Sequence, residues 1–77
     1  MKTEAAIRAE IEVYERDIAF YEHCQAEADR AFKAGDVTEK EYWHRSTHIL
    51  GQRRKGQAIV DALRWVLSED EESNANA

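Results

Sequence analysis

The chain lacks proline altogether and contains only three glycines, Gly35, Gly51 and Gly56, among its 77 residues. These are the two residue types that most often interrupt helices. Charged residues make up 35% of the chain, a composition that favours long helices over strands and turns. We therefore predict an all-α fold. A chain of this length forms one domain at most, and such a small core commonly supplies only about 3–5 kcal/mol, so many such folds recruit a partner.

Long apolar runs are also missing, and Cys24 is the single cysteine. An intrachain disulfide is therefore excluded, and a lone thiol fits a reducing compartment. The first 17 residues contain no apolar run of the kind that a secretory signal needs. No stretch approaches the roughly 20 apolar residues of a membrane span. We expect a cytoplasmic protein that does not enter a membrane.

The segment KAGDVTEKEYWHR, which begins at Lys33, carries the signals of a helix end followed by a helix start. Gly35 suits the position just after a helix, because glycine takes positive φ without steric cost. Thr38 and Glu41 have the spacing of a capping box, in which a hydroxyl and a carboxylate satisfy two backbone amides. The segment therefore predicts a joint between two helices. Their predicted bounds are 4–34 for the first helix and 38–68 for the second.

Before the joint, mostly apolar and aromatic residues recur at alternating spacings of four and three. After the joint, such residues recur every seven positions, with further apolar residues between them towards the C-terminal end. This seam comprises Ile7, Ile11, Tyr14, Ile18, Tyr21, Gln25, Ala28 and Phe32, then Tyr42, Ile49, Gly56, Val60, Leu63 and Leu67. Both predicted helices are roughly 47 Å long at 1.5 Å per residue, and equal arms favour an antiparallel helical hairpin. The alternative is a three-helix arrangement with a break at residues 51–56, although two glycines without proline break a helix poorly.

Folding the chain about residue 36 predicts which residues of the two helices face each other. The predicted pairs are Ile7 with Trp65, Ile11 with Leu63 or Val60, Ile18 with Gly56, and Tyr21 with Gly51. In this register both glycines make room for large side chains of the first helix. Glu15, Asp17 and Glu22 are placed near the basic run at residues 53–55, which they would largely neutralise.

A lone hairpin leaves apolar side chains exposed on its flanks. Val13, Phe20 and Cys24 lie beside the first seam, and residues 58–67 are apolar almost all round. Surplus apolar surface of this kind usually marks an interface. We therefore predict a homodimer that forms a four-helix bundle with coiled-coil-like packing. The hairpin domain is predicted over residues 1–68, followed by an acidic disordered tail over residues 69–77 that begins EDEE.

Four side chains are of the residue types found in catalytic or metal-binding sites. His44 and His48 are four residues apart, and the predicted register brings Cys24 and His23 towards His48, a combination that suits zinc. Cys24 and His48 are also the residue types of a nucleophile and its base. No metal-binding motif frames these residues, and a smooth helical face offers no loop-built pocket for an oxyanion. We therefore predict no metal site, no cofactor and no enzymatic activity.

Two binding surfaces remain. Trp43, Leu50 and Trp65 project from the second helix, and tryptophan is strongly enriched at binding hot spots; Phe20 and Val13 add apolar surface on the first helix. Arg53, Arg54 and Lys55 form the only basic cluster, on a chain whose net charge is −5. We predict an interaction module that binds another protein as an adaptor, inhibitor or regulatory subunit. The alternative is a nucleic-acid-binding regulator that uses the basic cluster.

Overall fold

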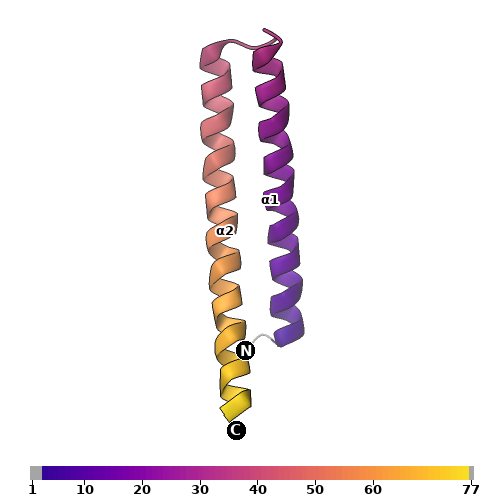
Figure 1. Cartoon of the computed structure of the whole chain (residues 1–77), viewed down its shortest axis with the longest axis vertical. Coiled ribbons are helices and arrows are strands. Elements are labelled where there is room, and N and C mark those ends of the chain that lie inside the picture. Colours follow the sequence, from indigo (N-terminus) through magenta and orange to yellow (C-terminus); the bar gives the residue numbers. More distant parts are fainter. Residues whose placement is uncertain (1–2, 77) are drawn as a thin grey trace.

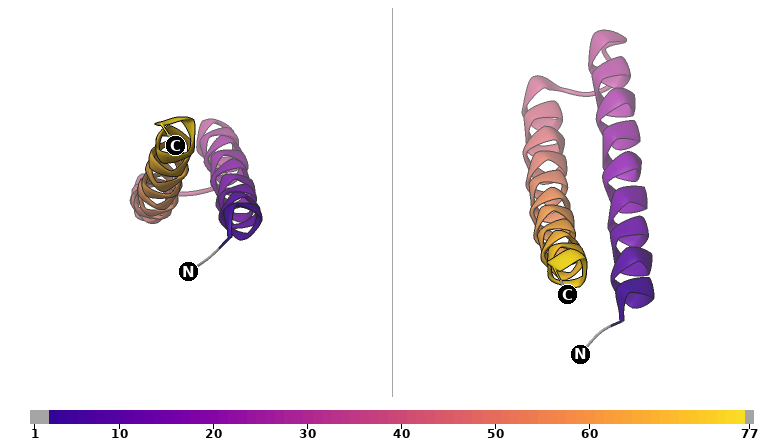
Figure 2. Two further views of the ribbon diagram at one scale, coloured as in Figure 1. Left: turned by 90° about the horizontal axis from the view of Figure 1, so that it is seen from below. Right: turned by 60° about the horizontal axis from the view of Figure 1, so that its bottom comes forward.

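Two antiparallel helices joined by one short turn form the whole structure (Figure 1). The computed structural model describes residues 3–76, with side chains described as far as Glu69. Helix α1 spans Glu4–Lys33 and helix α2 spans Glu39–Asn76. The hairpin measures 60 × 18 × 15 Å, and the helices stay side by side when it is viewed from below or tilted (Figure 2). No strand occurs in the described part of the chain, so the all-α prediction is confirmed.

Helix α1 begins at a threonine cap and is supported by charge pairs along its exposed side. The Thr3 hydroxyl accepts a hydrogen bond from the backbone N–H of Ala6 at 3.1 Å, which satisfies one of the amides that a helix start leaves without a partner. Arg8 and Glu4 pair one turn apart at 2.9 Å. Such pairs contribute only a few tenths of a kcal/mol each, so most of the stability of α1 comes from packing.

The joint has the structure that the sequence predicts. Gly35 has a φ of 78° and its N–H donates to the Phe32 carbonyl at 3.1 Å, while the N–H of Asp36 donates to the Ala31 carbonyl at 2.9 Å. These two bonds make a Schellman motif at the end of α1. At the start of α2 the Thr38 hydroxyl accepts from the N–H of Glu41 at 3.1 Å, so this half of the predicted capping box is present.

The core lies in the half of the hairpin away from the joint. It is made of Ile7, Ile11, Val60 and Leu67, with Tyr14, Ile18 and Leu63 packed against it. Val60 is only 1% exposed. Nearer the joint, Ala28 and Ile49 are also buried. The buried residues belong to the predicted seam, which confirms that the seam residues face the other helix.

Two of the predicted cross-helix pairs are wrong. Trp65 does not pack on Ile7 but is 62% exposed, since it lies between Leu63 and Leu67 and therefore points to the opposite side of α2. A Cβ atom added at Gly51 would meet nothing within 4 Å, so Gly51 does not make room for Tyr21. The prediction for Gly56 is confirmed, because a Cβ there would lie 3.2 Å from Cγ1 of Ile18.

Helix α2 is continuous through both glycines, so the three-helix alternative is wrong. It also continues as helix to Asn76, past the predicted end at Ser68. The reason is that no proline or glycine follows Gly56, so nothing in the later sequence stops a helix. The helix thus extends into the segment predicted as an acidic tail, whose disorder stays a prediction, and Ala77 lies outside the described residues.

Candidate interaction surfaces

The two helices enclose shallow grooves on opposite sides of the hairpin, and the two sides differ in chemistry. We call one side the tyrosine face. Its two grooves are lined by Tyr14, Asp17, Ile18, Tyr21, Gln52, Lys55, Gly56 and Ile59, and by Tyr21, His23, Cys24, Glu27, Ala28, Ala31, Arg45, His48 and Ile49. We call the other side the ion-pair face. Its grooves are lined by Arg8, Ile11, Glu12, Glu15, Ile18, Ala19, Glu22, Leu50, Arg53, Arg54, Gln57, Val60, Arg64 and Leu67.

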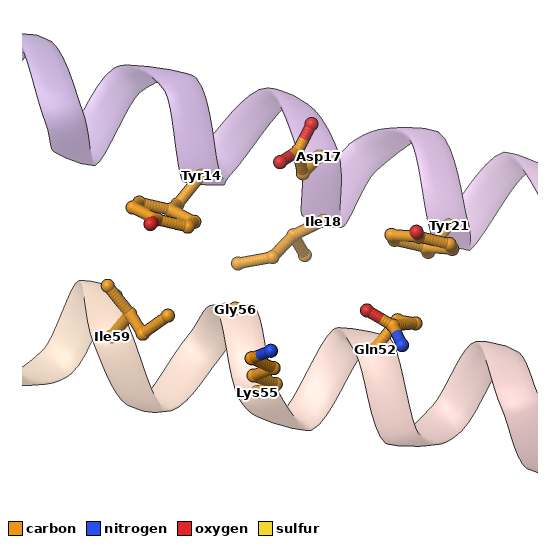
Figure 3. A pocket seen from close by; sticks show the side chains of 8 residues that line it. All are labelled: Tyr14, Asp17, Ile18, Tyr21, Gln52, Lys55, Gly56 and Ile59. Carbon is orange, nitrogen blue, oxygen red and sulfur yellow. The ribbon is translucent and has the colours of Figure 1, made fainter.

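The middle groove of the tyrosine face has a volume of about 190 Å³ and an apolar floor (Figure 3). Tyr14, Ile18 and Tyr21 extend from α1 towards α2, and Ile18 lies opposite the bare backbone of Gly56 (Figure 3). The Asp17 carboxylate points away from α2, and Lys55 is the only cation that lines this groove. The groove therefore combines apolar and aromatic side chains with an acid on α1, and with a base and an amide, Lys55 and Gln52, on α2.

A second groove on the same face, nearer the joint, has a volume of about 460 Å³ and a mostly apolar lining. It contains Cys24 and His48, so the structure brings together the pair that the sequence predicted to be near each other. His23 lies at its edge and pairs with Glu27 on its own helix at 3.9 Å. His44 does not line the groove. Within the part of the chain described here, no three metal-ligating side chains come together as a candidate metal site.

On the ion-pair face, oppositely charged side chains of the two helices pair directly. Arg64 of α2 donates to the Glu15 carboxylate of α1 at 2.6 Å. Arg53 lies 3.8 Å from Glu22, also across the helices, and its Nε is buried without a hydrogen-bond partner. The prediction that acids of the first helix neutralise the basic run is therefore confirmed for Arg53 with Glu22, whereas Glu15 pairs with Arg64 instead.

The basic cluster does not form one surface. Successive helical residues point about 100° apart, so Arg53, Arg54 and Lys55 diverge. Arg53 and Arg54 line one groove of the ion-pair face, where Arg53 turns towards Glu22, whereas Lys55 lines the tyrosine face. Lys55 therefore lies on a different face of the hairpin from Arg53 and Arg54.

The predicted partner-binding residues fall on separate surfaces. Trp43 and Leu50 are 60% and 44% exposed and lie seven residues apart, on one stripe of α2. Trp65 is about 33 Å from Trp43 along the helix at 1.5 Å per residue. Phe20 and Val13 are 59% and 54% exposed and belong to α1. The structure therefore provides an α2 patch at Trp43 and Leu50, an isolated Trp65, and an α1 stripe.

A polar cluster near the joint was not predicted. The Tyr42 hydroxyl donates to the Asp29 carboxylate at 2.6 Å, and the Gln25 amide donates to the same oxygen at 2.9 Å and to the Ser46 hydroxyl at 3.1 Å. The hydrogen bond from Tyr42, followed by that from Gln25, lowers the pKa of Asp29 below its ordinary 3.8. The same bond raises the pKa of Tyr42 above 10.0. The signal in the sequence was Gln25, the single amide in an otherwise apolar or aromatic seam.

No family model, curated protein or solved structure matches this chain. Across the described residues, neither helix contains a segment long and apolar enough to cross a bilayer. The surfaces of the hairpin are thus the basis for a functional interpretation.

Proposed function

We propose that this protein is a small non-enzymatic interaction module that binds another protein as an adaptor, an inhibitor or a regulatory subunit. In this proposal it acts in the cytoplasm and also self-associates into a four-helix bundle. The observation that carries the proposal is the exposed α2 patch formed by Trp43 and Leu50.

This patch has the features of a helix that docks into a groove of another protein. Trp43 and Leu50 are large apolar side chains on one stripe, with Thr47 between them one turn from Trp43. The Trp43 ring is supported by an edge contact with Tyr42, whose centroid is 5.5 Å away. Tyr42 in turn stacks on Phe32 at 4.5 Å. An aromatic anchor held in this way loses little conformational freedom on binding, which favours affinity.

Nucleic-acid binding through Arg53, Arg54 and Lys55 is the alternative, and the geometry supports it less. Binding that survives physiological salt commonly rests on about six to ten phosphate contacts. Lys55 lies on the opposite face from Arg53 and Arg54, and Arg53 is already close to a carboxylate of α1. The chain also carries a net charge of −5, which opposes association with a polyanion.

The test is an affinity capture from the native host with three baits: the unmodified chain, Trp43→Ala and Trp65→Ala. Each lysate is divided and half of it is treated with nuclease. We expect a protein partner that withstands nuclease, is lost on Trp43→Ala and is retained by Trp65→Ala, because only Trp43 belongs to the patch. Truncating a buried aromatic anchor costs about 2 kcal/mol or more, roughly a 30-fold loss of affinity.

Two results contradict the proposal. The first is salt-sensitive capture of nucleic acid by the unmodified chain, abolished when Arg53, Arg54 and Lys55 are replaced by glutamine. The second is equal capture by all three baits, which places the contact away from Trp43. Circular dichroism of the two tryptophan variants checks that both remain helical.

A further inference from the structure

We propose that the tyrosine face packs against the same face of a second copy about a two-fold axis parallel to the helices. Each α1 then lies on α2 of the partner. This inference rests on the self-association included in the proposed function, and it specifies which surface is used and how the two hairpins are oriented. Three observations carry it: exposed apolar side chains, unpaired charges, and the distribution of those charges between the helices.

The first observation is an apolar stripe of α1 that the hairpin does not cover. The stripe consists of Val13, Phe20 and Cys24, and it also contains Asp17. These four residues follow one another at intervals of four, three and four, so all of them lie on one side of α1. Asp17 and Cys24 line the grooves of the tyrosine face, which places the stripe on that face. Val13 and Phe20 remain more than half exposed.

The corresponding stripe of α2 is apolar towards the open end of the hairpin. Lys55, Ile59, Ala62 and Val66 are spaced by four, three and four, and the first two line the middle groove of the tyrosine face. Val66 is 37% exposed. Both helices thus offer apolar surface beside the seam, as each helix of a four-helix bundle must do to contact two neighbours.

The second observation is that charges on this face lack partners across the helices. Asp17, Lys55 and Arg45 form no ion pair with any residue that the structure describes. Glu27 pairs only within α1, with His23 and Arg30. On the ion-pair face, by contrast, Glu15 and Glu22 pair with arginines of α2. Asp17, Lys55 and Arg45 are therefore free to contact a second chain, and Glu27 has no described partner on α2.

The third observation is that these charges are segregated by helix. In the two grooves of the tyrosine face the carboxylates come only from α1, as Asp17 and Glu27, and the lysine and arginine come only from α2, as Lys55 and Arg45. A surface with acids along one edge and bases along the other is self-complementary only in certain orientations.

Two closed dimers can bury this face with aligned helices. If the two-fold axis runs across the helices, α1 packs on α1 of the second copy and acids meet acids. If the axis runs parallel to the helices, α1 packs on α2 of the second copy and acids meet bases. Like charges placed opposite one another in an interface are strongly unfavourable, so the charge pattern selects the parallel axis.

The parallel axis also fixes the register, because it keeps every residue at its own height along the bundle. Asp17 and Lys55 line the same groove of one hairpin, so they lie at similar heights. In the dimer Asp17 then faces Lys55 of the partner subunit. By the same argument Glu27 faces Arg45 of the partner subunit. Every such contact occurs twice, once on each side of the axis.

The first experiment compares dissociation constants by sedimentation equilibrium at moderate ionic strength. We expect Asp17→Lys and Lys55→Asp each to weaken the dimer on the order of tenfold, since each places two pairs of like charges in the interface. The double variant, which exchanges the two charges, should recover most of the loss. Glu12→Lys on the ion-pair face is the control for Asp17→Lys, because it makes the same change in net charge and should leave the dissociation constant unchanged.

The second experiment reads the orientation directly. Asp17→Cys and Lys55→Cys are introduced on separate chains that also carry Cys24→Ser, and the two chains are mixed and oxidised. We expect a disulfide between the two different chains, whereas either chain alone should remain largely uncrosslinked, because like positions lie on diagonally opposed helices.

The outcomes separate this inference from the function on which it rests. A chain that sediments as a monomer at micromolar concentration overturns the self-association and with it the proposed arrangement. A dimer that becomes tighter with Asp17→Lys, or that crosslinks through Asp17→Cys alone, overturns only the arrangement and indicates the crossed axis. Neither result bears on partner binding at Trp43, which lies outside the tyrosine face.

Discussion

Gly51 and Gly56 are five residues apart in the same helix, yet they have different surroundings. An added Cβ atom meets nothing within 4 Å at Gly51, whereas at Gly56 it lies 3.2 Å from Cγ1 of Ile18. Glycine in a helix interior costs roughly 0.5–1 kcal/mol relative to alanine. We expect Gly51→Ala to raise the free energy of unfolding by about that amount, because the added methyl group gains helix propensity and meets no neighbouring atom.

Gly56→Ala is the matched comparison. The same gain in helix propensity is offset there, since the methyl group forces Ile18 to shift by a few tenths of an ångström in a close-packed contact. Urea unfolding of the two variants at equal protein concentration measures the difference. Equal stabilisation by both substitutions would show that the close approach of Gly56 to Ile18 is not important.

The hydrogen bond between Tyr42 and Asp29 predicts a pH dependence with two limits. The pKa of Asp29 is lower in the folded chain than its ordinary 3.8. Its contribution to the stability of the fold is therefore complete above about pH 3.8 and is lost as the pH falls through its pKa in the folded chain. The pKa of Tyr42 is higher in the folded chain than its ordinary 10.0. Its contribution to stability is therefore complete below about pH 10.0 and is lost as the pH rises through its pKa in the folded chain. Tyr42→Phe should therefore destabilise the hairpin most at intermediate pH.

The measurement is the free energy of unfolding of the unmodified chain and of Tyr42→Phe across the pH range. We expect the unmodified chain to exceed Tyr42→Phe in free energy of unfolding by a constant amount from about pH 5 to about pH 9, and by less at lower and at higher pH. Phenylalanine keeps the ring that stacks on Phe32, so the comparison isolates the hydroxyl. A gap that does not change with pH would show that the hydroxyl does not interact with the ionised carboxylate.

At the scale of the helix, the start of α2 depends on one side-chain hydrogen bond. Thr38 accepts from the N–H of Glu41, and loss of such a cap typically costs about 1 kcal/mol. Thr38→Ala should therefore lower the melting temperature by the amount that corresponds to a loss of about 1 kcal/mol of stability. Thr47→Ala is the control: its hydroxyl donates to the Trp43 carbonyl inside the helix, and alanine is the better helix former there. Similar losses from both variants would argue against a specific cap.

The joint could be predicted from the sequence because its signals are local. Gly35 and Thr38 act on backbone groups within three or four residues, so their spacing alone contains the information. The residues of the seam could be predicted for the same reason, because their spacing along each helix is a local pattern. The structure differs at the joint only in that Ala34 and Thr38 cap the helices rather than belong to them.

The contacts of Trp65 and Gly51 could not be predicted by counting residues from the joint. That count gives the height of a residue along the hairpin but not the side of the helix on which it lies. Trp65 is level with the open end of the hairpin yet points outward, because Leu63 and Leu67 occupy the inner face. Which α1 acid pairs with which arginine likewise depends on rotation about both helix axes. The surface patches thus required the three-dimensional structure.

For the whole molecule, self-association predicts that stability depends on concentration. A dimer that unfolds to separate chains is stabilised by mass action, so the melting temperature should rise with protein concentration. Phe20→Glu places a charge in the apolar stripe of the tyrosine face, where burial without a partner is expensive. We expect this variant to lose the concentration dependence and to sediment as a monomer.

Trp65→Glu is the control for this prediction. Trp65 is an aromatic residue of similar exposure to Phe20, but it lies away from the tyrosine face. The variant should keep the concentration dependence of the unmodified chain, as followed by circular dichroism over a hundredfold range of concentration. If both substitutions abolish the effect, the interface extends around α2.

The position of the core has a mechanical consequence. Ile7, Ile11, Val60 and Leu67 lie in the half of the hairpin where α1 begins and α2 ends (Figure 1), so a force that pulls these two helix ends apart acts first on the best-packed contacts. Once these contacts break, the remaining interface towards the joint has fewer buried side chains to resist. Under tension the hairpin is therefore expected to hold its length and then open abruptly, as a latch does, instead of unzipping turn by turn.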